Sequence, residues 1–196
     1  MLDLVLSQRN VSAKVKISIQ TLVSVLVVVL SVALPQFVHI FAGSAGGVTY
    51  LPMYLPVILG GCLLGTYWGL GVGIMSPIAS FFVTSLMGNP MPIATRLPYM
   101  IVELAIFGLV SGLFSKKIFE NKWMAYPAVI SAILAGRLSF LAISFIFQSV
   151  SSIKGNLVWN QILNGYWGII IQLIVVPVVV ILLVKLLKKE KSEEQD

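Results

Sequence analysis

The chain has 196 residues and a formal net charge of +6 at pH 7; hydrophobic residues make up 58% of it and charged residues 10%. Typical soluble domains are about 45–50% apolar and about 25% charged. A soluble fold of this size cannot bury so much apolar surface, so the composition excludes an ordinary soluble enzyme, a disordered chain and a nucleic-acid-binding domain. Basic residues that flank long apolar runs are instead typical of a protein embedded in a lipid bilayer.

Six apolar stretches follow one another along the chain. A helix needs about 20 residues to span the hydrocarbon core of a bilayer, and five of the stretches reach or approach that length. The second is short, and no charged residue separates it from the third, so one long broken helix over Tyr50–Leu86 is the alternative. The stretches are Ile17–Phe41, Tyr50–Leu64, Thr66–Leu86, Pro98–Phe114, Trp123–Phe147 and Val158–Leu187.

The placement of basic residues decides between these alternatives. Ten of the 13 Lys and Arg residues lie in three clusters: Arg9, Lys14 and Lys16; Lys116, Lys117 and Lys122; and Lys185, Lys188, Lys189 and Lys191. The positive-inside rule places all three clusters in the cytoplasm, so an even number of crossings must separate Lys16 from Lys116. Four crossings meet this condition and three do not, which predicts a tight turn near Gly65.

The predicted fold is therefore an all-α integral membrane protein with six transmembrane helices and with both termini in the cytoplasm. Residues 1–196 form a single domain, in which 1–16 is a cytoplasmic N-terminal segment and 188–196 a charged C-terminal tail. Glycines recur every four residues in two series, Gly61–Gly73 and Gly108–Gly112. This spacing lets helix backbones approach closely in lipid, and we favour packing inside the bundle over a face for a partner.

Two predicted outer loops differ in composition. Ala42–Gly47 is rich in glycine and other small residues and is expected to be mobile. Met87–Pro98 contains three prolines, which fix the backbone φ angle and make the loop stiff. An ordered lid and a plain rigid connector both fit this second loop.

The chain has one cysteine, Cys62, and one histidine, His39. Disulfide frameworks and metal clusters need several such residues, so no metal and no cofactor is expected. His39 has no evident serine or cysteine partner and is interpreted as a histidine at the membrane interface. The chain is not expected to be an enzyme.

Two charged residues, Glu103 and Arg137, fall inside apolar stretches, where charge is costly and marks a functional candidate. With a rise of about 1.5 Å per residue, Glu103 lies ~7 Å below the outer boundary of a ~30 Å core, and Arg137 and Asn164 lie ~9 Å below it. Other candidates in this outer zone are Tyr99, Gln161 and Trp167, with Gln172 deeper. Equal depth fits an ion pair that joins two helices, and it also fits an outward-facing polar pocket for a small solute.

Four segments carry a resemblance to a known family: LPVILGGCLLGTYWGLGVGIMSPIASFFVTSLMGNP (Leu55–Pro90), LPYMIVELAIFGLVSGLF (Leu97–Phe114), AGRLSF (Ala135–Phe140) and GIIIQLIVVP (Gly168–Pro177). In order, spacing and topology they resemble the substrate-binding S components of energy-coupling factor (ECF) vitamin importers, over nearly the whole chain. The resemblance implies a multi-pass protein of the bacterial plasma membrane that binds a small-molecule vitamin in its outer half. It also implies two kinds of partner, a membrane T component and two cytoplasmic ATPase subunits. The chain has no GxxxxGK[ST] phosphate loop of its own, which agrees with this division of labour.

The candidate substrate-binding set is Arg96, Tyr99, Glu103, Arg137, Gln161, Asn164, Trp167 and Gln172. Two arginines stand against one carboxylate, and arginine suits a carboxylate or phosphate through bidentate hydrogen bonding. We therefore expect an anionic vitamin, with pantothenate as the first choice. A cobalamin precursor, a flavin or a pyridoxine-like vitamin is the alternative. A stand-alone small membrane carrier or a scaffold with a structural Glu103–Arg137 pair also stays open.

Overall fold

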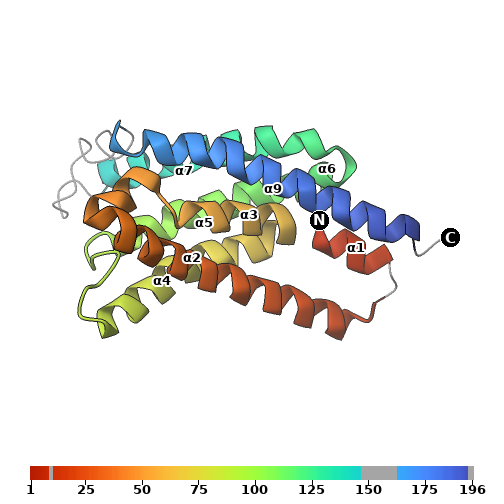
Figure 1. The fold of residues 1–196 in the computed structure, drawn as a ribbon, viewed down its shortest axis with the longest axis horizontal. Helices are drawn as coiled ribbons and strands as arrows, with labels where there is room; N and C mark the ends of the chain where they lie inside the picture. Colours follow the sequence, from red (N-terminus) through yellow and green to blue (C-terminus); the bar gives the residue numbers. More distant parts are fainter. Residues whose placement is uncertain (9–10, 147–162, 194–196) are drawn as a thin grey trace.

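The computed structural model describes residues 1–8, 11–146 and 163–193 (Figure 1). Every regular element within these ranges is a helix, as expected for a chain that must satisfy its backbone hydrogen bonds in lipid. The elements are α1 (Leu2–Gln8), α2 (Ala13–Tyr50), α3 (Tyr54–Leu64), α4 (Thr66–Leu86), α5 (Leu97–Leu113), α6 (Ser115–Glu120), the 3₁₀ turn η1 (Lys122–Met124), α7 (Ala125–Ile146) and α9 (Tyr166–Glu193).

Four of the described helices are long and apolar enough to cross a membrane, namely Ala13–Gly43 of α2, α4, Lys122–Ile146 around α7, and Tyr166–Lys188 of α9. The helices α3 and α5 are also apolar but shorter. The predicted all-α fold is thus confirmed, and four of its helices are suited to cross a membrane. α4 has the predicted bounds, whereas α3 begins at Tyr54 and not at Tyr50.

A single residue, Gly65, separates α3 from α4. Its backbone has φ 94° and ψ −177°, a conformation that residues with a Cβ rarely adopt. The Gly65 amide donates to the carbonyl of Gly61, which satisfies one of the last acceptors of α3. The predicted turn is confirmed, and one long helix over Tyr50–Leu86 is wrong.

The first predicted loop is wrong, because α2 continues to Tyr50. The backbone leaves the helical region only at Gly43, which has φ 65° and ψ −169°. Residues 44–50 resume a helix and fold back toward the bundle, as the orange ribbon in Figure 1 shows. A Cβ placed on Gly168 of α9 would lie 2.6 Å from the Tyr50 carbonyl oxygen, so the end of α2 packs closely against α9.

The loop between α4 and α5 is tied to α4 by hydrogen bonds. The Met91 amide donates to Thr84 Oγ1 at 2.7 Å, and Ser80 Oγ donates to the Met91 carbonyl at 2.8 Å. The Asn89 amide also donates to the Thr84 carbonyl, at 3.1 Å. These bonds favour the rigid connector over a loop that moves as a lid.

α1, the start of α2, α6 and the last turns of α9 lie at one end of the bundle (Figure 1). The loop between α4 and α5 lies at the opposite end. The basic clusters around Lys16, Lys116 and Lys185 are therefore gathered at the same end, as the charge pattern predicts.

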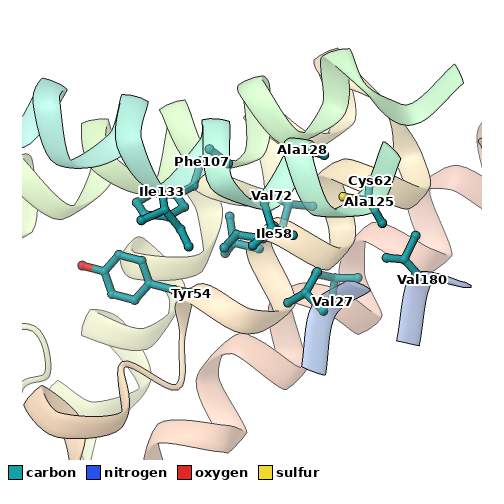
Figure 2. Packing of buried hydrophobic residues seen from close by; sticks show 14 of the residues in the cluster. Val27, Tyr54, Ile58, Cys62, Val72, Phe107, Ala125, Ala128, Ile133 and Val180 are labelled. Carbon is teal, nitrogen blue, oxygen red and sulfur yellow. The ribbon is translucent and has the colours of Figure 1, made fainter. Parts of the chain in front are cut away.

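The core lies around α3, in which most residues are buried (Figure 2). Next to it, α4 and α5 meet backbone to backbone: a Cβ on Gly108 would collide with the Gly69 carbonyl oxygen, and a Cβ on Gly73 with that of Leu104. Small residues in membrane helices permit this close packing. The interpretation of the glycine series as internal packing is confirmed at these positions.

Cys62 is fully buried in this core, between α3 and its neighbours. We expect its thiol to resist a membrane-permeant maleimide while the bundle is intact, because the reagent cannot reach the sulfur. Mass spectrometry after labelling, with and without denaturant, measures this protection. Rapid labelling of the folded protein would show that the core around α3 opens readily.

Candidate functional site

A buried polar cluster joins three helices in the half of the bundle away from α1 and the last turns of α9. It consists of Tyr54 at the start of α3, Glu103 in α5 and Arg137 in α7. Arg137 Nη1 lies 2.8 Å from Glu103 Oε1, and the Tyr54 hydroxyl donates to Glu103 Oε2 at 2.6 Å. Both oxygens of the carboxylate are thereby engaged.

The apolar surroundings hold this cluster in place. The Tyr54 ring packs edge-on against Phe107, with centroids 5.1 Å apart, and the Arg137 guanidinium carbon lies 5.3 Å from the Tyr54 ring centroid. A Cβ on Gly136 would collide with the Phe107 ring, so this glycine lets α7 approach α5 directly beside Arg137. Figure 2 shows the Tyr54 hydroxyl pointing away from the labelled apolar side chains.

The cluster is strongly buried: Glu103 is 0% exposed and Arg137 is 6% exposed. Charges so far from water are stable only when they are paired and hydrogen-bonded. Within the described residues, Arg137 Nε, Ser144 Oγ and Gln172 Nε2 are nevertheless buried without a hydrogen-bond partner. Both oxygens of the Glu103 carboxylate are therefore paired, whereas Arg137 still has a donor, Nε, without a partner.

The structure distributes the predicted site residues over three environments. Glu103 and Arg137 form the predicted pair, and Tyr99 is buried one turn away against Phe140, with ring centroids 6.0 Å apart. Gln172 is also buried, whereas the exposed candidates are Arg96, Asn164 and Trp167. Gln161 lies outside the described residues.

Two differences from the sequence reasoning stand out. Asn164 is exposed and precedes α9, which begins at Tyr166, so it does not belong to that helix; the helix start predicted at Val158 lies outside the described residues. Tyr54 was missed as a site residue. The apolar stretch that contains Tyr54 begins at Tyr50, so the helix rise places Tyr54 ~6 Å below the outer boundary. This depth is close to that predicted for Glu103, and it is the signal in the sequence that could have identified Tyr54.

The comparisons with known proteins agree with this architecture. A family model described as "ECF transporter, substrate-specific component" matches residues 15–180. That range contains the whole Tyr54–Glu103–Arg137 cluster and the helices that carry it. No curated protein and no solved structure matches the chain. The chain therefore belongs to the substrate-specific components of ECF transporters, which are membrane subunits of a transport system for small molecules and not enzymes.

Proposed function

We propose that the chain crosses a bacterial plasma membrane six times, with both termini in the cytoplasm, and captures a water-soluble anionic vitamin from outside. Pantothenate is the first candidate. The vitamin is then passed inward with the T component and the two ATPase subunits of an ECF transporter. The gathering of the basic clusters at one end of the bundle supports this orientation, because basic residues favour the cytoplasmic side.

The observation that carries the proposal is the buried polar cluster, together with the buried donors that have no hydrogen-bond partner. An apolar core at Glu103 and Arg137 would stabilise a membrane bundle at least as well as an ion pair does. Unpaired buried donors at Arg137 Nε and Gln172 Nε2 add a further cost. A solute with several oxygen atoms gives these donors the partners that they lack.

A ligand would approach this cluster from the outer end of the bundle along α5 and α7, which pack against each other. Residues three and seven positions apart share one face of a helix. On α5 and its cap these are Arg96, Tyr99 and Glu103, and on α7 they are Arg137, Phe140 and Ser144. The two helices are antiparallel, so Arg96, seven residues before Glu103, and Ser144, seven residues after Arg137, both lie two turns outward from the ion pair.

Arg96 fits the role of the group that binds the carboxylate of the vitamin. It is exposed at the outer end, next to the anchored loop, and in the described part of the chain it forms no ion pair. Arg137 is already neutralised by Glu103. A ligand bound along this face would place its anionic end at Arg96 and its hydroxyl and amide groups toward Ser144 and Gln172.

Calorimetric titration of the purified protein tests the proposal, with pantothenate, riboflavin, pyridoxine and a cobalamin precursor as ligands. We expect one-to-one binding of pantothenate and a loss of about 10-fold or more in Arg96→Ala, because a charge-assisted hydrogen bond is removed. Lys14→Ala removes an exposed cation at the opposite end and is the matched control. Equal affinity in Arg96→Ala, or binding of a neutral vitamin alone, would contradict the assignment.

A further inference from the structure

A basic groove lies at the end of the bundle that holds α1 and the last turns of α9, far along the helices from the Tyr54–Glu103–Arg137 cluster. It has a volume of about 600 Å³ and lies between the corner that joins α6 to η1 and the last turns of α9. Its lining consists of Glu120, Asn121, Lys122, Trp123, Val184, Lys185 and Lys188.

Positive charge dominates this groove. Three lysines line it and one carboxylate, Glu120, stands among them. In the described part of the chain none of these lysines forms an ion pair with a carboxylate. Lys188 Nζ lies 5.3 Å from the Phe119 ring centroid, and Lys122 Nζ lies 5.9 Å from that of Trp123, so aromatic faces hold two of the ammonium groups. Such an excess of lysines over carboxylates attracts an anion.

The rim of the groove is aromatic and leads to an apolar surface. Trp123 is 60% exposed, and its ring stacks on that of Tyr126 at 6.2 Å. Exposed Trp and Tyr side chains are typical of the boundary between lipid chains and water. From Tyr126 the exposed apolar residues continue along α7 every four positions, at Ile130, Leu134 and Leu138. The basic groove thus lies at the end of an exposed apolar strip on α7 that can pack against lipid acyl chains.

We propose that this groove binds the phosphate group of an anionic phospholipid from the cytoplasmic leaflet. Lys122, Lys185 and Lys188 contact the phosphate, and an acyl chain lies along the exposed strip of α7. A basic pocket between membrane helices on the cytoplasmic side fits such a headgroup. The assignment to the cytoplasmic leaflet rests on the orientation proposed above, but the lipid contact itself does not depend on vitamin binding.

Native mass spectrometry of the full chain in mixed micelles tests this proposal, with dioleoylphosphatidylglycerol as the probe and dioleoylphosphatidylcholine as the neutral comparison. We expect preferential retention of one phosphatidylglycerol. In the double variant Lys185→Gln/Lys188→Gln its affinity should fall about 30-fold, since each lysine near an anionic headgroup contributes roughly a five-fold factor. Lys116→Gln/Lys117→Gln makes the same charge change at the same end, outside the groove, and should retain the lipid.

Four results would overturn the proposal: equal retention of both lipids, equal loss in both double variants, no loss in Lys185→Gln/Lys188→Gln, or displacement of the lipid by inorganic phosphate at similar concentration. The last result would identify a site for a free anion. If Lys185→Gln/Lys188→Gln keeps the lipid but no longer assembles with the T component and ATPases, the groove is a protein contact. Pantothenate titration of the same samples separates a failure of this proposal from a failure of the proposed function.

Discussion

Removal of either partner of the Glu103–Arg137 pair is expected to lower the free energy of unfolding by about 3–5 kcal/mol, because the remaining charge stays buried without compensation. The two groups lie 2.8 Å apart and are almost completely shielded from water. Glu103→Leu leaves the guanidinium unpaired, and Arg137→Met leaves the carboxylate with only the Tyr54 hydroxyl. Denaturant titration in detergent, followed by circular dichroism, measures both losses.

The double variant Glu103→Leu/Arg137→Met should lose much less stability than the sum of the two single variants. Neither charge remains, and apolar groups of similar volume can replace a buried ion pair at little cost. Additive losses would contradict a direct pair. Because the double variant is expected to fold, it also shows whether the ion pair is needed for vitamin binding or only for stability. If it binds the vitamin normally, the pair serves only to join α5 and α7.

The exposed pair between Asp3 and Lys16 is the control for this cycle. Its atoms are 2.7 Å apart, but the side chains are 44% and 24% exposed. Asp3→Ala is expected to cost less than about 1 kcal/mol, as surface pairs do. The hydrogen bond from Lys16 holds the pKa of the Asp3 carboxyl below its usual value, so this small stabilisation is present at neutral pH and is lost as the pH falls through that lowered pKa.

Gly108→Ala is the second substitution with a large expected effect. Its Cβ would collide with the backbone carbonyl of Gly69, and backbone cannot move aside as a flexible side chain can. α4 and α5 must then separate along their whole contact. We expect a loss of about 3 kcal/mol or more, at the upper end of overpacking effects. The unfolding midpoint and the yield of monodisperse protein measure it.

Gly71→Ala is the matched control in the same helix pair. A Cβ on Gly71 would have nothing within 4 Å, and the position is exposed. There the substitution should be neutral or should stabilise the protein by up to about 1 kcal/mol, because alanine favours a helix more than glycine does. Similar losses in Gly71→Ala and Gly108→Ala would mean that close packing of α4 and α5 is not what glycine provides here.

The sequence predicts the helices well because hydrophobic length and basic charge act over many residues at once. The turn at Gly65 follows from counting crossings, and α4 begins and ends where its apolar stretch does. Glu103 and Arg137, which were predicted to lie at similar depths in the membrane, form an ion pair. Depth along an axis follows from residue number, since the helical rise is constant.

Rotation about the helix axis does not follow from residue number, since packing against neighbours sets it. Tyr54 reaches Glu103 from the first position of α3, which starts four residues later than its apolar stretch. Composition gave no reason for a helix over residues 44–50, where small residues are typical of a loop. The break in the helix before Tyr166, which separates Asn164 from α9, has no apolar or charged signal in the sequence either.

The single-residue connection at Gly65 constrains how the chain enters the bilayer during synthesis. α3 has 11 residues and a length of ~16 Å, about half of the hydrocarbon thickness, so the crossing that contains α3 must also use residues before Tyr54. No polar loop follows it that could hold its end at the surface while the next segment emerges from the ribosome. α3 and α4 must therefore leave the translocon together, as a preformed helical hairpin.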